Sequence, residues 1–163
     1  MPANIRLANR QVAALLLSAT LLVACGSGNS DDDGLADFAT RYAEAWSGRD
    51  AAALAAFYAE DGMLVINNGA PSVGRGAVEA TAAAFMAAFP DMVVELVELE
   101  RRDDTVIFHW RWTGTNTGPG GNGNAVDITG YEEWTLGGGM ILESDGHYDE
   151  AEYQQQMSVT REL

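Results

Sequence analysis

The sequence predicts an α+β domain, in which helices cover one face of a curved and mainly antiparallel sheet. Residues 35–89 carry apolar side chains mostly at spacings of three and four, which is typical of amphipathic helices. Residues 92–148 carry them at alternate positions, which is typical of strands. Helices followed by an antiparallel meander are the element order of an α+β fold.

The first residues have the pattern of a bacterial export signal. Arg6 and Arg10 precede an apolar run at 12–24, which is shorter than the ~20 residues needed to span a bilayer. The run ends in Leu-Val-Ala-Cys at 22–25, which resembles the bacterial lipobox and implies cleavage before Cys25 and lipidation of that residue. The alternative is an ordinary secretory signal with an incidental buried cysteine. We expect a signal peptide at residues 1–24.

Cys25 is the only cysteine, which leaves the folded part without a disulfide or a thiol catalyst. Several acyl chains on this residue would anchor the protein permanently. Gly26 stands where inner-membrane lipoproteins of enteric bacteria carry Asp, so the resemblance implies the periplasmic face of the outer membrane in a two-membrane host. Residues 26–34 have no apolar side chain, which predicts a solvated tether at 25–34 and one domain at 35–163.

The chain is strongly acidic, with a formal net charge of −15 at pH 7 and no lysine. Loss of Arg6 and Arg10 with the signal peptide would remove two positive charges and leave −17. A surface of this sign repels nucleic acid and anionic lipid head groups. We therefore expect no nucleic-acid partner, and membrane contact only through the N-terminal lipid.

The first predicted helix covers residues 35–46 and ends at Ser47-Gly48-Arg49. Its apolar stripe consists of Leu35, Phe38, Ala39, Tyr42, Ala45 and Trp46. Asp50 is the expected cap of a second helix that runs through Phe57. The elements that follow are a turn at 60–62, a strand at 63–67, a loop at 69–76 and a third helix at 77–89, which is stopped by Pro90.

The second half of the domain reads as four strands and a last helix. The predicted strands are 92–100, 105–117, 125–136 and 140–148, and the helix lies at about 150–157. The turns between the strands fall at 102–104, in the glycine- and asparagine-rich stretch 118–124, and at 137–139. No helix follows the glycine-rich stretch directly, so we interpret it as a hairpin loop and not as a phosphate cradle.

Several short motifs, in this order and spacing, resemble the SnoaL-like polyketide cyclases, a branch of the nuclear transport factor 2-like superfamily. They are Phe57–Gly62, Gly74–Gly76, Phe89–Asp91, Trp112–Gly118, Gly130, Ile141–Glu143, Tyr148-Asp149 and Tyr153–Gln156. The resemblance spans about residues 35–157 and implies a cone-shaped, cystatin-like fold that encloses an apolar pocket. A carboxyl group in such a pocket has its pKa raised by desolvation.

The resemblance also implies a general acid/base that acts on an enolisable ketone. Glu143 stands where the family acid stands, and Asp145 is a second candidate for the same role. The histidine that neighbours this acid in the cyclases falls at Thr129, which can donate a hydrogen bond but cannot relay a proton at neutral pH. Thr129 or Tyr131 is then the expected donor to an enolate oxygen.

Strand alternation separates two faces of the sheet, and two orientations remain open. A polar face carries His109, Arg111, Thr129, Tyr131, Glu143, Asp145 and His147, and a tryptophan face carries Val106, Phe108, Trp110, Trp112, Val126, Ile128, Trp134 and Leu136. In the first orientation, which we expect, the polar face lines the cone and the tryptophan face forms a homodimer interface. In the second, the tryptophans fill the core and the carboxylates face water.

These expectations define two functions for the domain. One is an enzyme with isomerase- or cyclase-type chemistry, in which a small, largely apolar molecule sits in a pocket that includes Thr129, Tyr131, His109, Arg111 and His147. The other is a binding or interaction module without catalysis. The positions of His109 and His147 within predicted strands favour structural roles for both histidines. No spacing of ligand residues suggests a metal, and we expect no other cofactor. A carboxyl group that lies in the pocket without a neighbouring cation would favour the enzyme, whereas a carboxyl group paired with Arg111 would favour the binding module.

Overall fold

The computed structural model describes residues 28–158. The predicted signal peptide at 1–24 and the lipid-bearing Cys25 lie outside the described residues, and so do residues 159–163. Among residues 28–158, no helix has the length and hydrophobicity that crossing a membrane requires.

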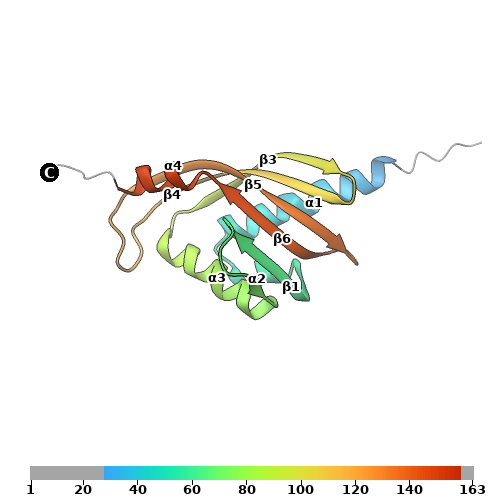
Figure 1. Ribbon diagram of the computed structural model, residues 1–163, viewed down its shortest axis with the longest axis horizontal. Helices are drawn as coiled ribbons and strands as arrows, with labels where there is room; N and C mark the ends of the chain where they lie inside the picture. The colour runs from blue at the N-terminus through green and yellow to red at the C-terminus, as the bar shows by residue number, and fades with distance from the viewer. Residues whose placement is uncertain (1–27, 159–163) are drawn as a thin grey trace, which may run out of the picture.

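The described residues form one six-stranded sheet and four helices (Figure 1). In chain order these are α1 (Gly28–Ser47), α2 (Ala51–Ala55), β1 (Tyr58–Ile66), β2 (Ser72–Val73), α3 (Arg75–Ala88), β3 (Val93–Arg102), β4 (Thr105–Thr115), β5 (Ala125–Gly137), β6 (Met140–Tyr148) and α4 (Glu150–Met157). The strand order is β2-β1-β6-β5-β4-β3, and only the β1–β6 pair is parallel. The predicted α+β fold with a curved, mainly antiparallel sheet is confirmed.

Helix α1 buries its apolar stripe, with Ala39 and Tyr42 fully buried and Trp46 nearly so. The helix begins at Gly28, seven residues before the predicted start at Leu35, so residues 28–34 of the predicted tether are helical. Once a packed segment has nucleated a helix, each further turn costs little, even where the sequence supplies no apolar contact. Asp50 caps α2 as predicted, because its carboxylate accepts a hydrogen bond from the backbone N–H of Ala53 at 2.9 Å.

Strand β1 begins at Tyr58, five residues before the predicted strand start at Met63. Its first part pairs with β6 through a hydrogen bond from the Ile141 N–H to the Phe57 carbonyl, and the register shifts before Met63. Gly62 permits this approach, since a Cβ atom there would lie 2.8 Å from the Ile141 carbonyl oxygen. The start of β1 is therefore determined by its long-range pairing with β6, and not by the turn residues at 60–62.

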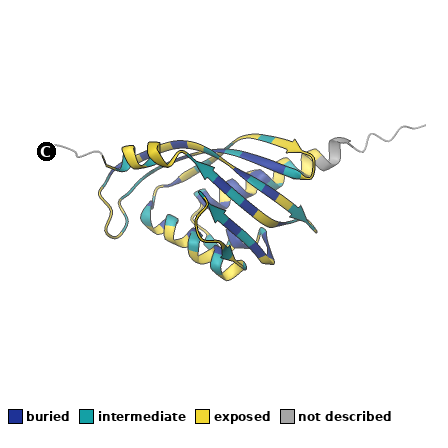
Figure 2. Ribbon diagram, viewed as in Figure 1, coloured by how far each residue is buried: buried dark blue, intermediate teal, exposed yellow. Residues whose placement is uncertain are grey.

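The tryptophan face is the inner face of the sheet, so the expected orientation was wrong and the alternative holds. Trp110, Trp112 and Trp134 are 9%, 5% and 0% exposed and pack in one core with helices α1 and α3. The alternation of buried and exposed residues along the strands is visible in Figure 2. Burying one indole removes roughly 200 Å², worth about 5 kcal/mol as an upper estimate. Turning charged side chains inward would instead cost several kcal/mol each.

Candidate active site

A cavity of about 70 Å³ lies inside the cone, between the inner face of the sheet and helices α1 and α3. Its walls are mostly apolar, and among the described residues that line it one carries a carboxyl group. The lining residues are Trp46, Leu64, Ile66, Phe85, Met92, Val94, Trp110, Trp112, Glu132, Gly146 and Tyr148. One water needs ~10–15 Å³ by a comparable measure, so the cavity has room for several waters or for part of a small molecule.

Glu132 is the carboxyl group of this cavity and is 7% exposed. Its Oε2 atom accepts three hydrogen bonds, from the Tyr42 hydroxyl at 2.9 Å, the Trp134 indole N–H at 2.8 Å and the Ser144 hydroxyl at 2.7 Å. Within residues 28–158, no donor reaches Oε1 and no cation pairs with this carboxyl group. The carboxyl group is thus held firmly by one oxygen while the other has no hydrogen-bond partner.

Burial raises the pKa of Glu132, because the charged form loses its hydration inside the cone. The three donors from Trp134, Ser144 and Tyr42 oppose this shift, but desolvation is the larger effect. The Tyr58 hydroxyl lies 2.9 Å from the Tyr42 hydroxyl and extends the network. The pKa values of both tyrosines are raised, first by burial and then by the Glu132 charge, so both act as neutral donors.

Sequence reasoning missed Glu132, although a local signal was present. Glu132 lies two residues before Trp134 and four after Ile128, so strand alternation places it on the tryptophan face. In the β5–β6 register it faces Gly146, whose missing side chain leaves space beside the carboxyl group. A carboxyl residue at a regular position on an otherwise apolar strand face indicates a buried functional group.

Glu143 and Asp145 do not lie in the cone, which corrects their predicted placement. The β5–β6 register shifts between the pairs Thr135–Glu143 and Leu136–Ile141, so Leu142 is an extra residue that breaks the alternation. Ile141 therefore points inward while Glu143 is exposed, and Ser144 takes the inner position next to Glu132. Asp145 lies outside the cavity wall, 3.5 Å from His147 Nε2.

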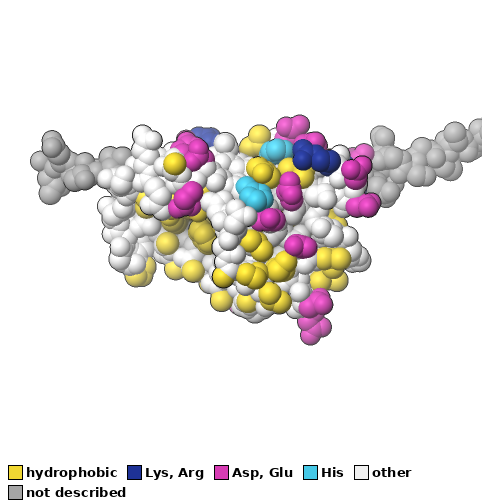
Figure 3. All heavy atoms as spheres, in the orientation of Figure 1, with side chains coloured by type: hydrophobic (Ala, Val, Ile, Leu, Met, Phe, Trp, Pro, Cys, Tyr) yellow, Lys and Arg dark blue, Asp and Glu magenta, His cyan; other side chains and the backbone are white. Residues whose placement is uncertain are grey.

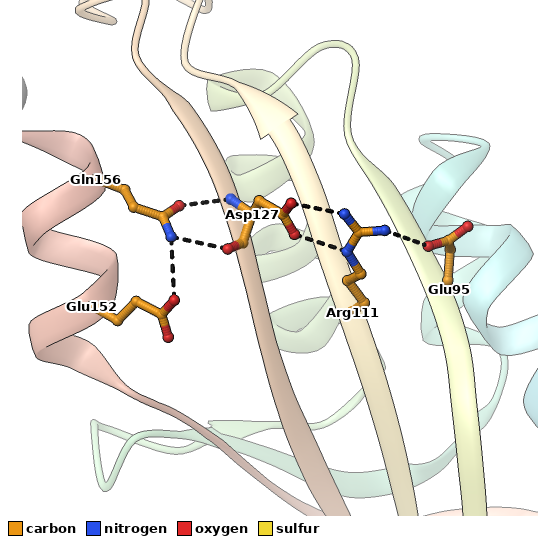
Figure 4. Close-up of polar contacts among 5 residues, drawn as sticks. All are labelled: Glu95, Arg111, Asp127, Glu152 and Gln156. Atoms are coloured by element: carbon orange, nitrogen blue, oxygen red, sulfur yellow. Dashed lines mark hydrogen bonds and ion pairs between the residues drawn. The ribbon is translucent and has the colours of Figure 1, made fainter.

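Arg111 also lies on the outer face and does not approach a pocket acid. Its guanidinium donates two hydrogen bonds to the Asp127 carboxylate, at 2.8 and 2.7 Å, and lies 3.5 Å from Glu95 (Figure 4). Gln156 of α4 then bonds to the backbone N–H and carbonyl of Asp127, which ties α4 to β5. Arg111 lowers the pKa of the exposed Asp127 carboxyl through these hydrogen bonds. This group of residues is an exposed structural clamp.

The other four predicted pocket residues come together outside the cone, on the polar face. His109, Thr129, Tyr131 and His147 line one open depression across β4, β5 and β6. The Tyr131 ring lies between the two imidazoles, with ring centroids 6.0 Å from His109 and 4.9 Å from His147. Figure 3 shows both histidines, in cyan, on one face among acidic side chains. Within residues 28–158, no cluster of three or more metal-ligating side chains occurs.

Residues 39–144 match the family model of the SnoaL-like domain, which is more than half of the chain. The chain belongs to the SnoaL-like family. This confirms the family predicted from the sequence motifs. No curated protein shows significant similarity to the chain.

Solved structures with the SnoaL-like, ketosteroid isomerase-like fold resemble this domain closely in shape. A putative SnoaL-like polyketide cyclase from Jannaschia is 19% identical, with a TM-score of 0.70 over 79% of this chain and 94% of that chain. A hypothetical protein from Catenulispora acidiphila, in complex with trimethylamine, is 22% identical, with a TM-score of 0.68 over 76% and 94%. TerC, co-crystallised with polyporic acid, is 13% identical, with a TM-score of 0.65 over 77% and 99%. At these identities the likeness concerns the fold alone.

Proposed function

We propose that the cone of this SnoaL-like domain binds a small, largely apolar molecule and that Glu132 exchanges a proton with it. One observation carries the proposal: a carboxyl group lies buried in an apolar cavity, with no cation beside it among the described residues. A buried carboxyl group that is not neutralised by a cation is costly to the fold and is typical of functional sites.

The reaction that such a group supports is proton transfer next to a carbonyl group. Oε1 of Glu132, which has no other partner, removes a proton from the carbon adjacent to the carbonyl and leaves an enolate. In an isomerisation the same oxygen returns the proton to another carbon. In a cyclisation the enolate carbon first forms a bond to the carbon of a second carbonyl group, and the oxygen of that group then takes the proton from Glu132. General acid–base catalysis contributes ~10²–10⁴-fold when the pKa of the group is near the working pH, and burial moves Glu132 in that direction.

The rival function is binding without catalysis, and one observation favours it. Three donors on Oε2 hold Glu132 in a network with Tyr42, Trp134 and Ser144, as in a fixed structural carboxyl group. The cone would then serve as a storage or sensing site. Proteins of the same fold have been crystallised with trimethylamine and with polyporic acid, which supports ligand binding in either case.

Gly146 offers a direct test of the cavity. A Cβ atom there would make ordinary contacts, 3.5 Å from the Val65 carbonyl oxygen and 3.6 Å from Glu132 Cγ, so Gly146→Ala should fold normally. Gly146→Val should fill the space beside Glu132. We expect mass spectrometry to find a small molecule that co-purifies with the wild type and the alanine variant but is depleted in the valine variant. Equal recovery from all three would contradict binding in the cone.

Catalysis and binding are separated by a second pair of variants. With an enolisable substrate found by screening, Glu132→Gln should lose ~10²-fold or more in turnover while still binding the substrate. Glu143→Gln, on the outer face, is the matched control and should keep full turnover. Retained turnover in Glu132→Gln would favour the binding module.

We also propose that Cys25 carries a lipid that anchors the exported domain, on the periplasmic face of the outer membrane if the host has two membranes. The Leu-Val-Ala-Cys sequence at 22–25 supports this proposal. Homodimerisation stays a prediction. The tryptophan face no longer supports it, because Trp110, Trp112 and Trp134 are buried within their own protomer. The outer side of the sheet, where Val97 and Tyr131 are exposed, is the surface that we now expect a dimer to use.

A further inference from the structure

Glu132 brings an ionisable group into the cone without a counter-ion among the described residues. Its side chain is 7% exposed and lines the cavity. Its Oε1 atom has no hydrogen-bond partner within residues 28–158, and it keeps accessible surface, in contrast to the indole nitrogens of Trp110 and Trp112, which are fully buried. A guest in the cavity can therefore reach this oxygen. A buried carboxyl group is costly unless it is neutral or paired, so the missing counter-ion requires an explanation.

The hydrogen bonds to Oε2 do not explain why this position carries Glu. A Gln side chain has an oxygen that could accept the same bonds from Tyr42, Trp134 and Ser144. It would also avoid the cost of burying a group that ionises. What Glu adds is the ability to carry a negative charge. Inside an apolar cavity that charge is stable only beside a cation.

Aromatic rings form much of the cavity wall around this carboxyl group. The ring of Phe85 meets that of Trp46 at 87°, with centroids 6.3 Å apart, and that of Trp112 at 81°, with centroids 5.9 Å apart. Trp110 and Tyr148, from β4 and β6, add two more rings to the wall. Rings that meet nearly at right angles surround a guest on several sides, and the faces of aromatic rings attract cations. A carboxylate among such rings fits an organic cation.

The walls and the size of the cavity decide which cation fits. Metal ions that are strongly hydrated need several oxygen ligands, whereas the described lining residues supply one carboxyl group. An alkylated ammonium holds its water more weakly and presents methyl groups to the rings. The cavity of about 70 Å³ is roughly half of the ~150 Å³ that holds benzene, which suits a head group of about three or four non-hydrogen atoms.

We propose that the cone holds a small secondary or tertiary alkylammonium group, which donates a hydrogen bond to Oε1 of Glu132 and lies with its methyl groups against the surrounding rings. The inference rests on the proposed binding of a small molecule in the cone and names the polar group of that molecule. An amine that enters uncharged takes the proton of Glu132, so an N–H bond forms as the O–H bond breaks and an ion pair results. The ligand is then the counter-ion that the described residues do not supply.

The test compares dimethylammonium with propane, which has the same number of electrons and nearly the same shape but no charge. The full-length chain is kept in detergent, with ¹³C labels on methionine methyl and glutamate carboxyl groups, and the pressure of propane fixes its free concentration. We expect dimethylammonium to move the methyl signal of Met92, which lines the cavity, with a dissociation constant in about the millimolar range. It should also move the Glu132 carboxyl signal towards the ionised position, and propane should not.

Variants measure the two parts of the site separately. Glu132→Gln should weaken dimethylammonium binding at least ~30-fold and change propane binding by less than ~3-fold. Phe85→Leu, which replaces a ring with an aliphatic side chain, should weaken dimethylammonium binding by about 3- to 10-fold and propane binding less. Glu143→Gln is the matched control, because it removes the same charge from the outer face and should leave both constants unchanged.

The outcomes separate this inference from the proposed function. If propane moves the Met92 signal and dimethylammonium does not, the cone binds neutral apolar molecules as proposed and the ammonium inference is overturned. If dimethylammonium binds equally well to the wild type and to Glu132→Gln, the ion pair is absent and the inference is also overturned. If neither probe moves the Met92 signal, binding in the cone fails and this inference fails with it.

Discussion

The Tyr42 hydroxyl donates a 2.9 Å hydrogen bond to Oε2 of Glu132 and so joins the first helix to the middle of the sheet. The two residues are 90 positions apart in the sequence, and both are almost completely buried. This contact holds in place the one carboxyl group found among the described residues of the cavity wall. It therefore links the stability of the cone to the ionisation of its candidate acid.

The first prediction concerns the pH dependence of stability. Burial raises the pKa of Glu132 above its unfolded value, so the folded state favours the protonated form. The contribution of Glu132 to stability is complete at a pH below its pKa in the unfolded chain, and it is lost as the pH rises through its higher pKa in the folded protein. A folded pKa one pH unit above the unfolded one corresponds to about 1.4 kcal/mol of stability. Glu132→Gln should therefore match the wild type in urea unfolding at low pH and be as stable or more stable at pH 8. A variant that is clearly less stable at pH 8 would indicate an ionised structural carboxylate.

The second prediction concerns the donor from α1. Tyr42→Phe removes a hydrogen bond that lowers the pKa of Glu132, so this pKa should rise further, and the free energy of unfolding should fall by about 1 kcal/mol. Tyr58→Phe is the matched control, because the Tyr58 hydroxyl contacts Tyr42 and not Glu132 directly. Carboxyl NMR titration of both variants measures the difference. Equal pKa values for Glu132 in the two variants would contradict the direct role of Tyr42.

The third prediction tests which sheet face is buried. Trp110→Arg places a charge in the core and removes a large buried ring, so unfolding should become easier by about 4 kcal/mol or more. Thr129→Arg introduces the same side chain on the neighbouring strand but on the exposed face, and should change stability by less than about 0.5 kcal/mol. Thermal unfolding compares the two. A folded, stable Trp110→Arg variant would restore the opposite orientation of the sheet.

The fourth prediction concerns the anchor. Cys25→Ser removes the thiol to which lipid would be attached, so incorporation of labelled fatty acid should be lost and processing of the precursor should stop. Metabolic labelling followed by separation of membrane and soluble fractions measures both effects. Ser27→Ala, two residues away, should be processed and lipidated normally. A processed, membrane-bound Cys25→Ser protein would rule out the lipobox interpretation.

Much of the fold was predictable because it depends on local chemistry. The apolar stripe of α1, the cap at Asp50, the stop at Pro90 and the turns of the meander each act within a few residues. The order of elements and the family motifs were then sufficient to identify the SnoaL-like fold. The start of β1 was not predictable in this way, because its first residues pair with a strand more than 80 positions later.

The candidate site was less predictable than the fold, although the sequence pattern contains a signal for its main residue, Glu132. Strand alternation alone is enough to put Glu132 on the same sheet face as Trp110, Trp112 and Trp134, although we did not name it among the candidates. Which face points inward depends on the area that the whole domain buries, and that is a property of the packed layers and not of any strand. The extra residue at Leu142 further changed the inner residue of β6 to Ser144.

Only the tertiary structure could bring Tyr42, Trp134 and Ser144 to one oxygen of Glu132. The physical reason is that local sequence determines period, caps and turns, whereas desolvation depends on every element that surrounds a group. The raised pKa of Glu132 and the aromatic walls around its carboxyl group exist only after helices and sheet have closed over them.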